Sequence, residues 1–309
     1  MSGQTALAGL VQVLGTTIAA PLIPGLTQTI KARLQGRRGA SPLQPYRELA
    51  RLWQKSVVDP TGSGPIYRTA PAIVAASVVL ACLLVPVSGQ APDWPVGHDA
   101  FVLFGLLALA RFAIAASAWD TGSGFALQGA SRELATGIAV EALLVLTLAS
   151  AAIAASTTDL RGMARASAGL HVWDNPAQAL TLVAFLLVIV AETGRQPVDN
   201  PDTHLELTML HEGPLLEYAG RDLVYLQGAA AARSWLVLGL AAAIFLPHPA
   251  GFGWGVALLP VAIGVLAVAL ALLETLVAKM RILLVPRLLG AGAGLALVAV
   301  LIRIVELPG

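Results

Sequence analysis

Long apolar stretches alternate with shorter polar ones along the whole chain. The hydrocarbon core of a bilayer is about 30 Å thick, and a helix needs about 20 apolar residues to cross it. Applied to this sequence, that length predicts eight spans, of which the fifth and sixth are short. Their ranges are 6–30, 69–88, 100–118, 134–156, 177–191, 233–246, 253–278 and 287–305. We therefore expect an all-α, polytopic membrane protein in which residues 1–309 form a single integral membrane domain.

The composition supports a membrane protein and limits its chemistry. Hydrophobic residues make up 57% of the chain and the mean hydropathy is +0.77, whereas soluble domains contain about 45–50% apolar residues. The basic residues are not interleaved with aromatic ones, which argues against nucleic-acid binding. Cys82 is the single cysteine, so this chain alone can neither close a disulfide nor hold an iron–sulfur cluster. We expect no cofactor on this chain and no cleavable signal peptide, because the first apolar stretch is too long for one.

The connection after the first span is strongly basic. It holds eight lysines and arginines against two acids, whereas the second connection has no lysine or arginine. By the positive-inside rule, residues 31–68 form a cytoplasmic loop and the N-terminus lies outside. Within this loop, residues 45–55 place Leu49, Leu52 and Trp53 on one face and basic residues on another. That pattern predicts an amphipathic helix at the membrane surface.

The densest group of charges follows the fifth span. Between residues 190 and 222 the chain carries Glu192, Arg195, Asp199, Asp202, Glu206, Glu212, Glu217, Arg221 and Asp222, together with His204 and His211. Gly194 and Pro197 interrupt any helical pattern, a short helix is expected over 202–212, and Gly220 is expected to end a second helical piece. Irregular backbone beside a span needs protein or water partners. We therefore predict that residues 190–232 form a broken, charged cytoplasmic segment that lines a cavity.

Four charged residues fall inside or next to predicted spans. A carboxylate inside a span costs about 2.5–3.5 kcal/mol, which favours a proton-path role for Glu141, about two turns beyond Glu133. Gly137, between them, is expected to let another backbone approach. Arg111 lies in the middle of the third span, where it either extends to the surface or pairs with an intramembrane carboxylate. For Glu274, a surface ion pair with the basic residues that follow it is the simpler interpretation.

The acids and imidazoles suit a proton relay better than a metal site or a hydrolase. His204 and His211 are about 10 Å apart along a helix, too far to bind one ion together, and no nucleophile and base stand out as a pair. Carboxylates and imidazoles can be tuned by burial to exchange protons near the working pH. The proton-path candidates are Glu133, Glu141, Glu192, Asp199, Glu206, Glu212, Glu217, His204 and His211, together with Arg111 and Arg195. The sequence assigns no catalytic or metal-binding residue.

Several motifs resemble a known family. The patterns E-T-x-R-x-P-x-D-x-P at 192–201 and E-Y-x-G at 217–220 resemble the signature loop of the quinone-binding membrane subunit of NADH-quinone oxidoreductase, respiratory complex I. The string D-N-P-x-T-H-L-E-L-T-M-x-H-E at 199–212 is similar to the hydrogenase branch of that family, which includes hydrogenase-4 component C and formate hydrogenlyase subunit 4. The strings P-L-Q-P-Y-R-E-L at 42–49 and D-T-G-S at 120–123 also resemble this branch.

The resemblance implies a membrane-anchor and ion-coupling subunit of an energy-converting nickel–iron hydrogenase complex of the formate hydrogenlyase kind, located in the inner membrane. Its implied partners are the hydrogenase large and small subunits, an iron–sulfur subunit and antiporter-like membrane subunits. Iron–sulfur clusters and the nickel–iron centre are expected in those partners. The alternative is the quinone-binding membrane subunit of a complex I-type NADH-quinone oxidoreductase, with a quinone in the cavity. A stand-alone secondary transporter predicts two matching broken helices, whereas the sequence has one broken, charged segment.

Overall fold

The computed structural model describes residues 9–10, 12–86, 97–168, 172–199, 210–246 and 252–306, and of residues 252–256 the backbone alone. The regular elements in these ranges are helices, and one isolated bridge joins Asp99 to Asp159. In chain order they are η1 (Gly15–Ala19, a π-helix), α2 (Leu22–Leu34), α3 (Gln44–Trp53), α4 (Pro65–Leu83), α5 (Ala100–Thr121), α6 (Gly124–Ala155), α7 (Leu160–Ser167), α8 (Pro176–Glu192), η2 (Gly213–Leu215), α9 (Gly220–Phe245), α10 (Phe252–Leu276), η3 (Ile282–Leu284) and α11 (Val285–Glu306). The all-α prediction is confirmed.

Six of the described helices are long and apolar enough to cross a membrane, namely α4, α5, α6, α9, α10 and α11. The segment Gln12–Ala19 and α2 would together make one more span, with a 47° bend between them. The remaining apolar helix, α8, has 17 residues. Within the described residues, each of the eight predicted ranges therefore falls on helical structure. That all eight segments cross the membrane stays a prediction.

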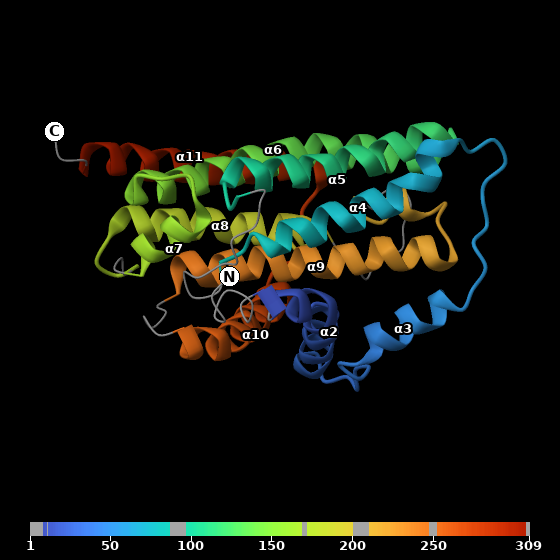
Figure 1. The fold of residues 1–309 in the computed structure, drawn as a ribbon, viewed down its shortest axis with the longest axis horizontal. Coiled ribbons are helices and arrows are strands. Elements are labelled where there is room, and N and C mark those ends of the chain that lie inside the picture. Colours follow the sequence, from blue (N-terminus) through green and yellow to red (C-terminus); the bar gives the residue numbers. More distant parts are fainter. Residues whose placement is uncertain are drawn as a thin grey trace.

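The long helices α4, α5, α6, α8, α9 and α11 run side by side along the length of the molecule (Figure 1). Helix α9 is the central one, because 83% of its apolar window is buried, against 28% for α11. A helix that is apolar on every face is typical of such a buried position. Helix α3 and the α5–α6 turn lie at one end of the bundle, on the right in Figure 1. We call this the charged-loop end and the other the opposite end.

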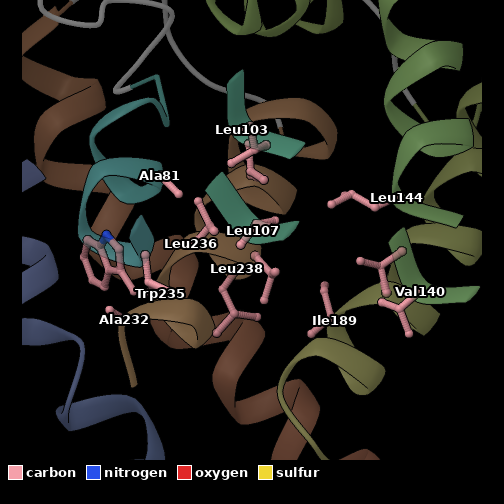
Figure 2. Close-up of a cluster of buried hydrophobic side chains, with 14 of the residues drawn as sticks. Ala81, Leu103, Leu107, Val140, Leu144, Ile189, Ala232, Trp235, Leu236 and Leu238 are labelled. Atoms are coloured by element: carbon pink, nitrogen blue, oxygen red, sulfur yellow. The ribbon is translucent and has the colours of Figure 1, made fainter. Parts of the chain in front are cut away.

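The apolar core joins all six of these helices. In Figure 2, side chains of α4, α5, α6, α8 and α9 gather in one cluster; they include Ala81, Leu103, Leu107, Val140, Leu144, Ile189, Leu236 and Leu238. All of them are buried. Because lipid is as apolar as these side chains, close packing between helices, rather than exclusion of water, holds such a bundle together.

Two helices begin earlier than the hydropathy pattern predicts. Helix α9 begins at Gly220 rather than at 233, and α6 begins at Gly124 rather than at 134. Charged residues near these starts lie outside the apolar stretch from which each span was predicted. The helix nevertheless continues through them. Gly220, expected to end a helix, instead begins one. Its φ is +58°, and a side chain there would lie 2.6 Å from the carbonyl oxygen of Ser56, so glycine is required.

The charged segment between α8 and α9 differs in detail from the prediction. Because α9 begins at Gly220, the irregular part ends at 219 rather than at 232. Most of the expected helix over 202–212 lies outside the described residues, and residues 210–212 are not helical. The single turn η2 follows, with Pro214 in its first turn.

The amphipathic helix predicted at 45–55 is present as α3. Its Leu52 is buried, whereas Arg47 and Arg51 are exposed. At the end of α3, the guanidinium of Arg221 lies over the Trp53 ring, 5.3 Å from the ring centroid. These contacts fix α3 against the start of α9.

Candidate functional site

A group of charges lies inside the bundle, where α5, α6, α8 and α9 meet. Arg111 of α5 donates hydrogen bonds to Glu141 of α6 and, at 2.8 Å, to Glu192 at the end of α8. Arg233 of α9 completes the group, with its Nη1 3.8 Å from Oε2 of Glu192. We call Arg111, Glu141, Glu192 and Arg233 the inner ion cluster. Of the two interpretations of Arg111, pairing with an intramembrane carboxylate is the one found.

The inner ion cluster is balanced in charge and unequal in exposure. Two arginines face two carboxylates, and this mutual attraction offsets part of the cost of removing each charge from water. The side chains of Arg111 and Glu192 are 7% and 1% exposed, whereas that of Glu141 is 26% exposed. Glu141 is therefore the acid through which this cluster reaches the molecular surface.

Gly137 serves the cluster in a way that the sequence did not indicate. The expectation that it lets another backbone approach is wrong, because the space beside it is filled by the Arg111 side chain. A Cβ at Gly137 would collide with the Arg111 side chain. The carbonyl oxygen of Gly137 also accepts a hydrogen bond from Nη1 of Arg111 at 3.4 Å. Glycine is needed here because the guanidinium passes close to the α6 backbone.

A second group of charges lies around Glu274 of α10. The Glu274 side chain is 0% exposed, and its Oε2 lies 3.3 Å from Arg195 Nη1 and 3.9 Å from Lys31 Nζ. The predicted surface ion pair for Glu274 is therefore wrong. The carboxylate points inward, where it joins α10 to α2 and to the segment that follows α8.

Asp199 organises the irregular segment after α8. Its Oδ1 accepts a hydrogen bond from Lys279 Nζ at 3.1 Å, and its Oδ2 lies 3.4 Å from Nδ1 of His211. The backbone amide of Leu210 also donates to Oδ2 at 3.2 Å. One carboxylate thus joins the residues on either side of 200–209 to the connection that leads into α11.

A cavity of about 560 Å³ lies beside both groups. Its polar lining includes Glu133, Arg195, Asp199, His211, Glu212 and Arg233, and residues of α2, α3 and α9 form much of the rest. Glu133 is 7% exposed and lies on α6 one turn before Gly137. Residues of the predicted charged segment therefore line a cavity, and Arg233 links that cavity to the inner ion cluster.

Glu217 and Tyr218 anchor the end of the charged segment, away from the cavity charges. Ser123 donates a hydrogen bond to the Glu217 carboxylate at 2.6 Å, and the hydroxyl of Tyr67 donates to the Glu217 carbonyl at 2.6 Å. The rings of Tyr67 and Tyr218 stack with centroids 4.4 Å apart. Burial raises the pKa of Tyr218 to about 12, so its hydroxyl stays protonated and donates to the Tyr67 carbonyl at 3.1 Å.

The structure divides the predicted site residues into sets. Arg111, Glu141 and Glu192 lie in the inner ion cluster, and Glu133, Arg195, Asp199, His211 and Glu212 line the cavity. Glu217 lies apart from both, and His204 and Glu206 lie outside the described residues. Sequence reasoning missed Lys31, Arg233 and Lys279. Each stands at the edge of an apolar stretch, where basic residues usually anchor a span at the surface.

The sequence of this chain matches a known protein family and individual relatives. The family model of NADH dehydrogenase matches residues 7–304. The chain belongs to the NADH dehydrogenase family. Within this family, it is 31% identical to formate hydrogenlyase subunit 4 of Escherichia coli (strain K12) over 305 residues, which cover 94% of this chain and 96% of that protein. It is 34% identical to hydrogenase-4 component C of the same strain over 246 residues, 79% of this chain and 76% of that one.

A solved structure shares the fold. The chain superimposes with a TM-score of 0.83 on a chain of the membrane-bound sulfane sulfur reductase, an archaeal respiratory membrane complex, at 19% identity. The match covers 97% of this chain and 99% of the other. The resemblance read from the charged segment is thus confirmed, both for the NADH dehydrogenase family and for its hydrogenase branch.

Proposed function

We propose that this chain is the membrane-anchor and ion-coupling subunit of an energy-converting nickel–iron hydrogenase complex of the formate hydrogenlyase kind. The relatives that it matches over most of their length support this role. Its partners would be the hydrogenase large and small subunits, an iron–sulfur subunit and antiporter-like membrane subunits. The redox centres would lie in those partners, and this chain would carry the charges that respond to them.

The observation that carries the proposal is the arginine that bridges two carboxylates inside the bundle. Arg111 holds Glu192, which is fully buried, and Glu141, which is partly exposed. Protonation of one carboxylate weakens its bond to Arg111, because the Coulomb attraction between the two opposite charges is lost. The guanidinium would then shift towards the other carboxylate. A charge change near Glu192 is in this way transmitted to Glu141.

Proton exchange with Glu192 would take place from the cavity. Arg233 lines the cavity and contacts Glu192, and His211, Glu133 and Glu212 line it as well. A redox event at the charged-loop end would change the electrostatic potential around these groups. That change would alter the protonation of Glu192. Because Glu141 is partly exposed in the middle of a span, where a carboxylate facing lipid is costly, a membrane subunit would cover it and take up the signal.

The orientation in the membrane is part of the same proposal. We place the chain in the inner membrane with eight crossings, the N-terminus outside and the charged-loop end on the cytoplasmic side. The exposed arginines of the connection between α2 and α4 support this orientation by the positive-inside rule. The soluble arm would then dock at α3 and at the segment between α8 and α9.

The test of this function is a Glu141→Gln variant in the assembled complex. We expect proton translocation to fall while formate-dependent hydrogen evolution is largely kept, because glutamine retains the shape but cannot carry a proton. Asp174→Asn, which neutralises an exposed acid just before α8 at the opposite end of the bundle, is the control and should keep both activities. Full translocation by an intact Glu141→Gln complex would remove Glu141 from the path.

The cavity supports one alternative, the quinone-binding membrane subunit of a complex I-type NADH-quinone oxidoreductase. Its volume of about 560 Å³ falls in the range of ligand pockets, roughly 300–1,000 Å³. Purification of the tagged chain in mild detergent separates the two functions. Recovery of a hydrogenase large subunit with hydrogen evolution supports the proposal, and recovery of NADH dehydrogenase subunits with quinone reductase activity supports the alternative.

A further inference from the structure

One face of α8 carries polar side chains at both ends and apolar ones between them. At helical spacing, this face consists of Gln178, Thr181, Phe185, Val188 and Glu192. All five are buried, none being more than 3% exposed. Glu192 belongs to the inner ion cluster, whereas Gln178 and Thr181 lie near the opposite end of the bundle.

The polar groups near the opposite end form two hydrogen-bonded groups that are adjacent on the α8 face. Thr181 is hydrogen-bonded to Ser150 of α6 at 2.8 Å, and Gln178 accepts a hydrogen bond from Arg303 of α11 at 3.0 Å. Arg303 also pairs with Glu306 at 3.2 Å, and the Glu306 side chain is 40% exposed. We call Ser150, Thr181, Gln178, Arg303 and Glu306 the outer polar column. It leads from the interior of the bundle to the surface at the opposite end.

An apolar layer separates the outer polar column from the inner ion cluster. Phe185 and Val188 occupy the α8 face between them, and both are 0% exposed. The Phe185 ring packs against Phe245 of α9, with centroids 5.5 Å apart. Leu144 and Leu148 of α6 belong to the same buried cluster. The gap from Thr181 to Glu192 is about 16 Å along the helix axis.

This layer has the properties of a barrier to protons. Protons cross a protein along chains of titratable groups and water, and a hydrophobic constriction blocks such a chain by excluding water. Here one apolar layer interrupts a face whose two ends both bear buried polar groups. If water entered the layer, the buried hydroxyl and amide groups beyond it would let a proton pass to the surface at the opposite end.

We propose that Phe185, supported by Val188, is a hydrophobic seal that prevents protons from crossing this chain between Glu192 and the outer polar column. The seal adds to the proposed function, because a proton that reaches Glu192 can then leave only by way of Glu141 or back through the cavity. Without it, the ion gradient would dissipate through this chain.

The test measures passive proton flux and requires neither partners nor turnover. Full-length chain in proteoliposomes is exposed to an imposed potassium diffusion potential, and a trapped pH-sensitive dye reports proton entry. We expect Phe185→Asn to raise the flux several-fold over wild type. Phe185→Leu, which shortens the side chain but keeps it apolar, is the matched control and should stay close to wild type.

Two further variants show whether the flux uses the proposed route. Thr181→Val and Gln178→Leu, each combined with Phe185→Asn, should reduce the flux again because they remove the polar groups beyond the seal. An unchanged flux in well-folded Phe185→Asn, an equal rise in Phe185→Leu, or a rise that persists in both double variants would overturn the proposal.

A milder substitution keeps the test valid if Phe185→Asn does not fold. Val188→Thr replaces one methyl group by a hydroxyl at nearly the same volume and should give a smaller but measurable rise in flux. Absence of any rise in that case overturns the seal. Failure of the proposed function is separate, since it appears as normal translocation by Glu141→Gln in the assembled complex.

Discussion

At the scale of single residues, Arg111 joins three helices through two ion pairs. It satisfies two carboxylates from different helices, which the planar, forked guanidinium can do and a lysine ammonium does less well. Without Arg111, Glu141 would lose its ion pair, and Glu192 would keep the more distant Arg233, whose Nη1 lies 3.8 Å from its Oε2. The guanidinium therefore stabilises the packing of α5, α6 and α8 as well as the charges themselves.

We expect Arg111→Ala to destabilise the protein by about 3–5 kcal/mol, the usual cost of leaving a buried partner unpaired. The measurement is the midpoint of unfolding in detergent. Combining it with Glu192→Gln should recover part of the loss, because the remaining side chain is then neutral. Arg51→Ala, which breaks an exposed pair with Glu48, should cost about 1 kcal/mol or less. Equal effects of Arg111→Ala and Arg51→Ala would contradict a structural role for the inner pair.

At the scale of elements, the shortness of α8 accounts for the position of the charges. Its 17 residues span about 25 Å, less than a bilayer core of about 30 Å. The helix therefore ends at Glu192 while the chain is still near the bundle interior. The irregular backbone that follows is compatible with this depth because α2, α9 and α10 surround it.

Helix α6 approaches this irregular segment closely at one point. A Cβ at Gly129 would lie 2.8 Å from the Cα of Gly213, so the two backbones touch. We expect Gly129→Ala to lower stability by about 1–3 kcal/mol through overpacking, measured by thermal unfolding in detergent. Gly105→Ala, inside α5 with open space beside it, should be neutral or stabilising by up to about 1 kcal/mol, since alanine favours helix. A destabilised Gly105→Ala with a neutral Gly129→Ala would reverse this interpretation.

Hydropathy alone predicted some elements well and others poorly, for a physical reason. Helices α5 and α11 were placed within a few residues, because lipid requires a continuous apolar stretch at those positions. The starts of α6 and α9 were missed because helices continue past their apolar parts into charged turns. The partners of Arg111 and Glu274 depend on which helices are neighbours, and that information lies in contacts between distant parts of the chain.

At the scale of the whole molecule, the two ends of the bundle differ in chemistry. The charged-loop end holds the basic connection between α2 and α4, whereas the opposite end holds α7 and the C-terminal end of α11 (Figure 1). The charged segment lines the cavity, and Arg303 near the end of α11 belongs to the outer polar column. This asymmetry is what a subunit needs if redox partners act at one end and ions must not leak to the other. Which of the two ends faces the cytoplasm can be measured by labelling residues from one side of the membrane.

Single cysteines labelled from one side of the membrane test that orientation and the crossing of α4, α5 and α6 together. Cys82, the single native cysteine, is fully buried and so gives an unreactive background. We expect Ser41→Cys, before α3, to react with a membrane-impermeant maleimide only after the cells are permeabilised. Asp174→Cys, just before α8, should react in cells with an intact inner membrane, because an odd number of crossings separates the two positions. Labelling of both from the same side would mean that at least one of α4, α5 and α6 does not cross the membrane, because these three helices separate the two positions.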